Sequence, residues 1–136
     1  MASTQSLIRI STGQVYLNLF GQYWWIFDEA TLAGVFGSNP SITDVTSLPS
    51  GAQLGPTLAP GSGILQPDGS DNLYLVCTGL KPVTSYFITS QDVQAYFQFN
   101  GPVQTCNNQT ISNWLMALIA DGQNITMPSV STAVNG

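Results

Sequence analysis

The chain has 136 residues, of which only 7% are charged and 43% are hydrophobic, and it contains no histidine. Its formal net charge is −5, and its two basic residues, Arg9 and Lys81, are too few to bind a nucleic acid or an anionic membrane surface. The absence of histidine excludes Ser-His-Asp and Cys-His catalysis. The length fits one domain or two closely packed halves.

The N-terminal residues 1–14, MASTQSLIRISTGQ, combine small polar residues with a weakly alternating stretch. Leu7–Ile10 predicts a short edge strand. The segment has neither the basic region nor the apolar core of a secretory leader, so we expect no signal peptide in this chain. Glycine and proline interrupt the rest of the chain too often for an apolar membrane span, and we expect no membrane insertion.

Residues 14–37 predict a strand, a turn, a second strand and a short helix. Val15–Phe20 is rich in β-branched and aromatic residues, and Gly21-Gln22 offers a tight reversal. Tyr23–Phe27 then predicts the second strand of a β-hairpin. Asp28 is a typical N-cap residue for the helix that follows, and Gly37 is suited to end it.

The same order recurs 58 positions later, where Tyr74, Leu75 and Gly79 repeat Tyr16, Leu17 and Gly21. A hairpin with one short helix cannot bury its apolar face alone, so we expect the two units to pack against each other. The sequence therefore predicts a single domain over 1–136, made of two repeats at about 7–55 and 64–126 with a linker at 55–63. Residues 122–125 also echo residues 51–54, which extends the correspondence toward the end of each repeat.

A third helix is predicted near the C-terminus, where an apolar stripe begins at Thr110 or Ser112 and ends before Asp121. The predicted fold class is α+β, with two pseudo-symmetric β-hairpin-plus-short-helix repeats and this extra C-terminal helix. An all-β fold with short helices is the alternative. For Cys77 and Cys106, a disulfide and two buried free thiols both remain open.

The run Tyr23-Trp24-Trp25 is the most informative local feature for function. Alternate strand residues face opposite ways, so at least one large ring of this run lies on the outer side of the sheet. An exposed ring beside amide and carboxylate groups is typical of a sugar-binding site, and it suits a subunit interface equally well. The candidate ligand-binding residues are Tyr23, Trp24, Trp25, Asp71, Asn72 and Tyr86.

Nothing in the chain predicts catalysis or metal binding. The seven carboxylates are not placed as a pair across a cleft, so we expect no enzyme activity and no catalytic residues. The oxygen-rich loop 68–72 does not match the spacing of an EF-hand, so we expect neither a metal site nor a cofactor.

Both units share the pattern Tyr-Leu, three residues, Gly, then an aromatic-rich segment and a short helix that ends in Phe. It covers Val15–Phe36 and Leu73–Phe97, about a third of the chain, although at this spacing Pro82 stands where the first unit has Trp24. The pattern resembles tandem lectin-like β-rich repeats of bacterial and phage surface proteins.

With the neutral polar composition, this resemblance implies a non-catalytic glycan-binding adhesion protein at an extracellular or virion surface. The alternative is a structural component of a large assembly, such as a virion decoration or tail protein. The expected partners are a glycan or neighbouring subunits, and we expect a homo-oligomer.

Overall fold

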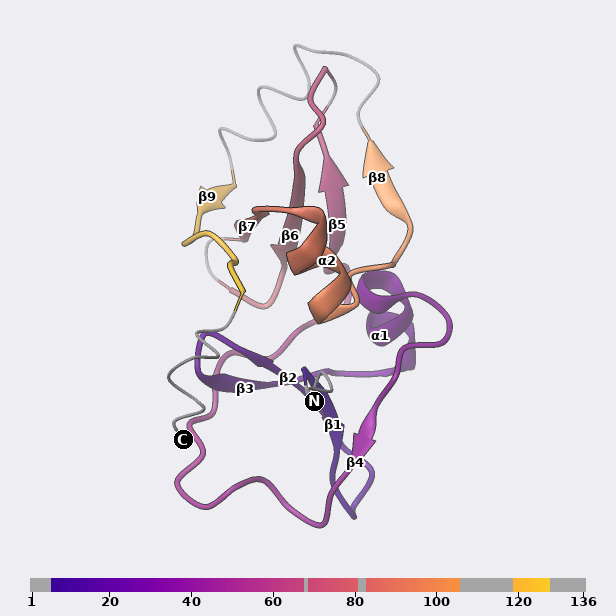
Figure 1. Cartoon of the computed structure of the whole chain (residues 1–136), viewed down its shortest axis with the longest axis vertical. Helices are drawn as coiled ribbons and strands as arrows, with labels where there is room; N and C mark the ends of the chain where they lie inside the picture. The colour runs from indigo at the N-terminus through magenta and orange to yellow at the C-terminus, as the bar shows by residue number, and fades with distance from the viewer. Residues whose placement is uncertain (1–5, 68, 81–82, 106–118, 128–136) are drawn as a thin grey trace.

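The computed structural model describes residues 6–67, 69–80, 83–105 and 119–127. Two β-sheets lie one above the other along the long axis, and the two helices lie beside the part of the upper sheet that is nearer to the lower one (Figure 1). The first sheet contains β1 (Leu7–Arg9), β2 (Val15–Leu19), β3 (Gln22–Trp25) and β4 (Thr43–Asp44). The second contains β5 (Gly63–Gln66), β6 (Leu73–Cys77), β7 (Thr84–Ile88), β8 (Val103–Thr105) and β9 (Ala120–Asp121). The helices are α1 (Glu29–Phe36) and α2 (Gln91–Phe97).

Of the described residues, 35% are in strands and 14% in helices. The fold is therefore mostly β with few helices, which agrees with the all-β alternative better than with the predicted α+β class. Most of the extra helix predicted near the C-terminus falls on residues 106–118, which lie outside the described part of the chain. Ala120, placed at the end of that helix by the sequence, belongs instead to strand β9.

The two sheets have the same strand order and the same strand directions. In the first sheet the order is β3-β2-β1-β4, with antiparallel pairing between β3, β2 and β1 and parallel pairing between β1 and β4. The second sheet repeats this arrangement in the order β7-β6-β5-β8, with antiparallel pairing between β7, β6 and β5 and parallel pairing between β5 and β8. A parallel neighbour completes each outer edge, at Leu54 beside β3 and as β9 beside β7.

The first hairpin turns at Phe20-Gly21, one residue earlier than predicted. Both residues have positive φ, 57° and 75°, which is the pattern of a type I′ turn. A phenylalanine is strained in this conformation, but its ring packs against Tyr86, with ring centroids 5.2 Å apart. The contact ties the turn of the first hairpin to a strand of the second sheet.

Strand pairing defines which residues of the two halves correspond. Tyr16 lies opposite Trp25, and Tyr74 lies opposite Phe87 in the second sheet. One position further along, Trp24 and Tyr86 occupy matching places opposite Leu17 and Leu75. The spacing of 58 thus holds only for the first strand of each hairpin, and the match between Pro82 and Trp24 drawn from the sequence is wrong.

A similar correction applies at the outer edges. Ile26 forms a bridge with Leu58, and Ile88 forms the matching bridge with Ile125. Ile125 therefore corresponds to Leu58, and not to Leu54 as the sequence echo indicated. Leu58 is fully buried although it lies in the stretch 55–63 that was predicted to be a linker, so this part of the stretch belongs to the core.

One hydrophobic core unites both halves. Its centre is the contact of Trp24 with Tyr86, whose rings meet edge to face with centroids 6.0 Å apart. The indole nitrogen of Trp24 donates a hydrogen bond to the backbone oxygen of Leu19 at 3.1 Å. The remaining fully enclosed side chains come from every part of the described chain, and the largest are Phe36, Phe99, Leu7, Leu17, Leu19, Leu58, Ile64, Leu75 and Ile125.

Glycine lets the edge segments pass directly over these two rings. A Cβ added to Gly55 would lie 2.9 Å from the indole nitrogen of Trp24, and one added to Gly122 would lie 2.2 Å from the ring of Tyr86. Gly55 and Gly122 take corresponding places, one residue beyond the edge residues Leu54 and Asp121. Close packing of a glycine against a buried aromatic ring therefore occurs at the matching place in both halves.

Candidate functional site

Two of the predicted ligand-binding residues are part of the core. Trp24 is 1% exposed and Tyr86 is 9% exposed, because each points from its sheet toward the other half. Neither ring is presented to a ligand on the surface, and we remove both from the candidate site. The sequence did not separate Trp24 from its neighbours because alternation shows that two faces exist and leaves open which one is covered.

Trp25 and Tyr23 lie on the opposite face of the same strand, as the alternation predicted. Trp25 is 37% exposed, and Tyr23 is partly exposed. The ring of Trp25 stands beside that of Phe27, which is 50% exposed, with centroids 5.6 Å apart and planes tilted by 54°. Phe27 was not among the predicted site residues, although it is the last apolar residue before the helix cap and continues the alternation of the strand.

The exposed pair Trp25 and Phe27 forms one wall of a depression of about 360 Å³, which we call the first depression. It lies where β2 begins, where β3 ends and where α1 starts. Its lining combines rings, carboxylates, an amide and a hydroxyl: Thr12, Gly13, Gln14, Val15, Trp25, Ile26, Phe27, Asp28, Glu29 and Leu32. Ligand sites usually run from about 300 to 1,000 Å³, so this depression has room for a small ligand such as one sugar ring.

Negative charge borders the first depression. The amide and hydroxyl of Thr31 donate hydrogen bonds of 2.8 and 2.6 Å to the Asp28 carboxylate, which caps α1. These hydrogen bonds hold the pKa of Asp28 below its ordinary value, so the group is ionised at neutral pH. Glu29 is exposed beside it, and the depression therefore disfavours anionic ligands.

A second depression of about 220 Å³ occupies the matching place in the other half. Its lining residues are Asp71, Asn72, Leu73, Phe87, Ile88, Thr89, Ser90, Gln91 and Gln94. Strand pairing and the two helix caps, Asp28 and Ser90, align each of these residues with one that lines the first depression. The fold thus brings the predicted residues Asp71 and Asn72 together with Phe87 in the second depression. It does not bring them to Trp25, which lines the first depression.

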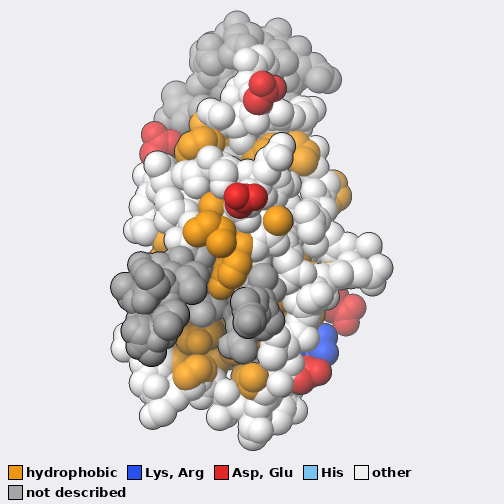
Figure 2. All heavy atoms as spheres, in the orientation of Figure 1, with side chains coloured by type: hydrophobic (Ala, Val, Ile, Leu, Met, Phe, Trp, Pro, Cys, Tyr) orange, Lys and Arg blue, Asp and Glu red, His pale blue; other side chains and the backbone are white. Residues whose placement is uncertain are grey.

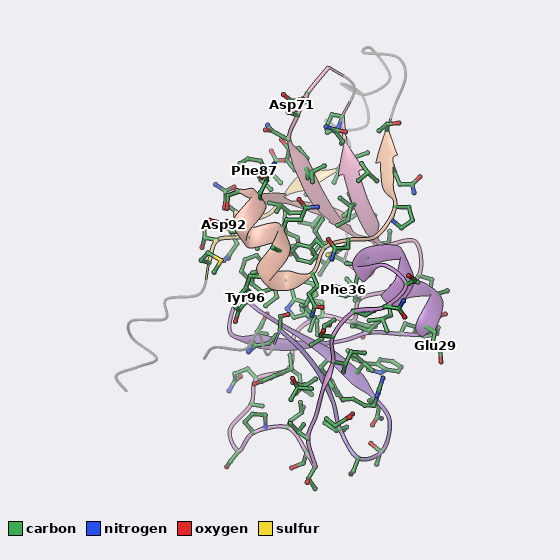
Figure 3. All side chains as sticks on the ribbon, turned by 45° about the vertical axis from the view of Figure 1, so that its right-hand side comes forward. Glu29, Phe36, Asp71, Phe87, Asp92 and Tyr96 are labelled. Carbon is green, nitrogen blue, oxygen red and sulfur yellow. The ribbon has the colours of Figure 1, made fainter. Side chains whose placement is uncertain are left out.

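The two depressions share a shape but differ in chemistry. Phe87 replaces Trp25, Thr89 replaces Phe27, and the carboxylates of the first depression give way to Ser90 and Gln91. The second depression keeps one ring and one carboxylate, that of Asp71, and is richer in amides. Figure 3 shows Glu29 at the first depression and Asp71 and Phe87 at the second on well-separated parts of the molecule.

The surface around these sites is largely uncharged. Figure 2 shows one face covered mostly by backbone and uncharged side chains, with a few scattered acidic side chains, one basic side chain and hydrophobic side chains exposed in several places. Within the described ranges, no group of three or more metal-ligating side chains lies together.

Cys77 is a buried free thiol, and burial raises its pKa to about 12; Cys106 lies outside the described residues. No helix in the described part of the chain is both long and apolar enough for a membrane span.

Comparison with known proteins gives no relative: the chain matches no protein-family model, no curated protein and no solved structure.

Proposed function

We propose that this protein is a non-catalytic glycan-binding module that holds its ligand in the first depression. The observation that carries the proposal is the exposed ring pair of Trp25 and Phe27, which stands beside ionised and amide side chains in a concavity of one-ring size. The face of an aromatic ring is electron-rich and packs well against the C–H groups of a sugar. Carboxylate and amide groups meet hydroxyl groups with hydrogen bonds.

The charges of the site narrow the class of glycan. Asp28 and Glu29 would repel an acidic sugar, and the chain as a whole has a net charge of −5. The ligand is therefore a neutral or amino sugar. The second depression is a weaker site of the same kind, because it offers one ring instead of two.

We also infer that the two halves are copies of one unit, which the shared strand order, the matching cap positions and the paired glycines support. Two sites on one rigid chain suit attachment to a surface that presents many sugars, because the second binding event is then intramolecular. An extracellular or virion surface is the setting that such a protein requires.

A glycan array of neutral, amino and acidic sugars, followed by calorimetry of the best ligand, tests the proposal. Trp25→Ala should weaken binding by about tenfold or more, since loss of one ring contact of about 1.4 kcal/mol has that effect. Tyr23→Ala is the matched control, because Tyr23 lies on the same face of β3 but does not line the depression. Equal losses for both variants, or no binding to any sugar, would refute the site.

A second variant tests whether the carboxylates of the first depression select the ligand. Glu29→Gln keeps the size of the side chain and removes one negative charge from the rim of the first depression. It should improve binding of an acidic sugar relative to its neutral counterpart. An unchanged ratio would show that the carboxylates do not select the ligand.

A second candidate function is that of a structural subunit in a homo-oligomeric assembly. The observation in its favour is a matching cross-strand row of two rings on the outer face of each sheet, Tyr16 with Trp25 in the first and Tyr74 with Phe87 in the second, all of them at least partly exposed. Cross-strand rows of this kind supply aromatic anchor area for an interface. Sedimentation at micromolar concentration tests it: a stable oligomer that Trp25→Ala dissociates, without sugar binding, would favour assembly over glycan recognition.

A further inference from the structure

A third concavity lies on the outer face of the second sheet, at the edge where β9 pairs with β7. It measures about 270 Å³ and is lined by Tyr74, Ser85, Phe87, Asp121, Gly122 and Asn124. Only Phe87 also lines the second depression, so the remaining five residues belong to neither site described above. We call this concavity the sheet-face site.

The sheet-face site exists because the two halves differ at one pair of matching positions. Tyr23 pairs with Leu54 at the edge of the first sheet, and Ser85 pairs with Asp121 at the edge of the second. The second half thus replaces a phenol ring with a hydroxymethyl group and an apolar edge residue with a carboxylate. The exchange leaves a hollow on the sheet and places a charged acceptor at its rim.

The hydroxyl of Ser85 lacks a hydrogen-bond partner among the described residues. Ser85 is 2% exposed, and its oxygen is buried without a donor or acceptor in reach. Burying an unpaired hydroxyl is unfavourable, and alanine would occupy the same space without that penalty. The serine is therefore best explained by a partner that comes from outside the chain.

The groups around Ser85 indicate which partner fits. The rings of Tyr74 and Phe87 stand 5.5 Å apart, tilted by 43°, and form an aromatic wall. Asp121 and Asn124 are exposed at the opposite rim, where a carboxylate accepts and an amide both donates and accepts hydrogen bonds. We propose that the sheet-face site binds a single neutral polyhydroxylated ring, such as a monosaccharide. In that pose one ligand hydroxyl lies over Ser85 and others lie at Asp121 and Asn124.

The proposal does not depend on binding at the first depression, and an NMR titration of the full chain separates the two. Glucose, galactose, mannose and N-acetylglucosamine are the probes. At least one should shift the amide signals of Ser85, Asp121, Gly122 and Asn124 in a saturable way. The Trp25→Ala variant should show the same shifts with unchanged affinity.

Three variants test the assignment. Ser85→Ala removes the hydroxyl and should weaken binding by about three- to tenfold. Asp121→Asn keeps the shape of the rim and should weaken it by a similar factor. Ser85→Tyr restores the ring found at Tyr23 and should abolish binding; if it does not fold, the other two variants decide.

Two results would overturn the proposal. One is the absence of saturation by all four sugars at concentrations up to about 100 mM. The other is saturable binding that neither Ser85→Ala nor Asp121→Asn weakens. In that case the bound sugar does not contact Ser85 or Asp121.

Discussion

Replacement of Trp24 by alanine tests whether the two sheets share one core. Truncation of a buried tryptophan costs about 3–5 kcal/mol, because the cavity closes only in part. The backbone oxygen of Leu19 would also lose the indole N–H that now donates to it at 3.1 Å, which adds about 1 kcal/mol. The expected loss of about 4–6 kcal/mol is a large share of the roughly 5–15 kcal/mol by which most domains are stable.

Urea unfolding followed by far-ultraviolet circular dichroism measures this loss. With a slope of about 2 kcal/mol per molar urea, the midpoint should fall by about 2–3 M. Trp25→Ala is the matched control, since it removes the same side chain from the next residue, whose ring faces outward. It should cost about 1–2 kcal/mol, well below the loss for Trp24, because its ring is partly exposed and keeps contacts only with neighbours on the outer face. Equal midpoints for the two variants would refute the assignment of Trp24 to a shared core.

Two further predictions concern the same core. Gly122→Ala places a methyl group 2.2 Å from the ring of Tyr86 and should cost about 1–3 kcal/mol in urea unfolding. Gly63→Ala, whose methyl group would meet only the backbone oxygen of Gly34 at 3.7 Å, an ordinary contact distance, is the control, and an equal or larger cost there would contradict the close packing. In a Cys106→Ser background, Cys77 should react with a thiol reagent at pH 8 only as fast as the protein unfolds. Burial raises the pKa of the Cys77 thiol in the folded protein to about 12. The contribution of Cys77 to the free energy of unfolding is therefore full below the pKa of the thiol in the unfolded chain, and it is lost as the pH rises toward 12. Rapid labelling of the native protein would show that the thiol is accessible.

Local patterns predicted the secondary structure of the paired segments well. The Asp28 cap is confirmed by its hydrogen bonds to Thr31, and Ser90 caps α2 in the same way, because its hydroxyl accepts from the backbone N–H of Val93 at 3.2 Å. Both hairpins are present at the predicted positions to within a few residues. These features depend on side-chain chemistry within a few positions, which a sequence displays directly.

The correspondence between the halves was harder to read because the hairpin loops differ in length. The first loop has two residues, Phe20 and Gly21, whereas residues 78–83 separate the paired strands of the second hairpin. The alignment by letters therefore shifts after the turn. It matched Trp24 with Pro82 when strand pairing matches Trp24 with Tyr86.

The sequence by itself determined that the chain is poor in charge, lacks histidine, forms two hairpin-helix segments and has large rings on both faces of one strand. Only the tertiary structure decided which rings are buried and which line a concavity. Burial depends on what the other half covers, and the second sheet covers Trp24 while it leaves Trp25 and Phe27 exposed. The same dependence brought Asp71 and Asn72 to Phe87 and placed Ser85 beside Asp121, because pairing between strands distant in the chain sets these contacts.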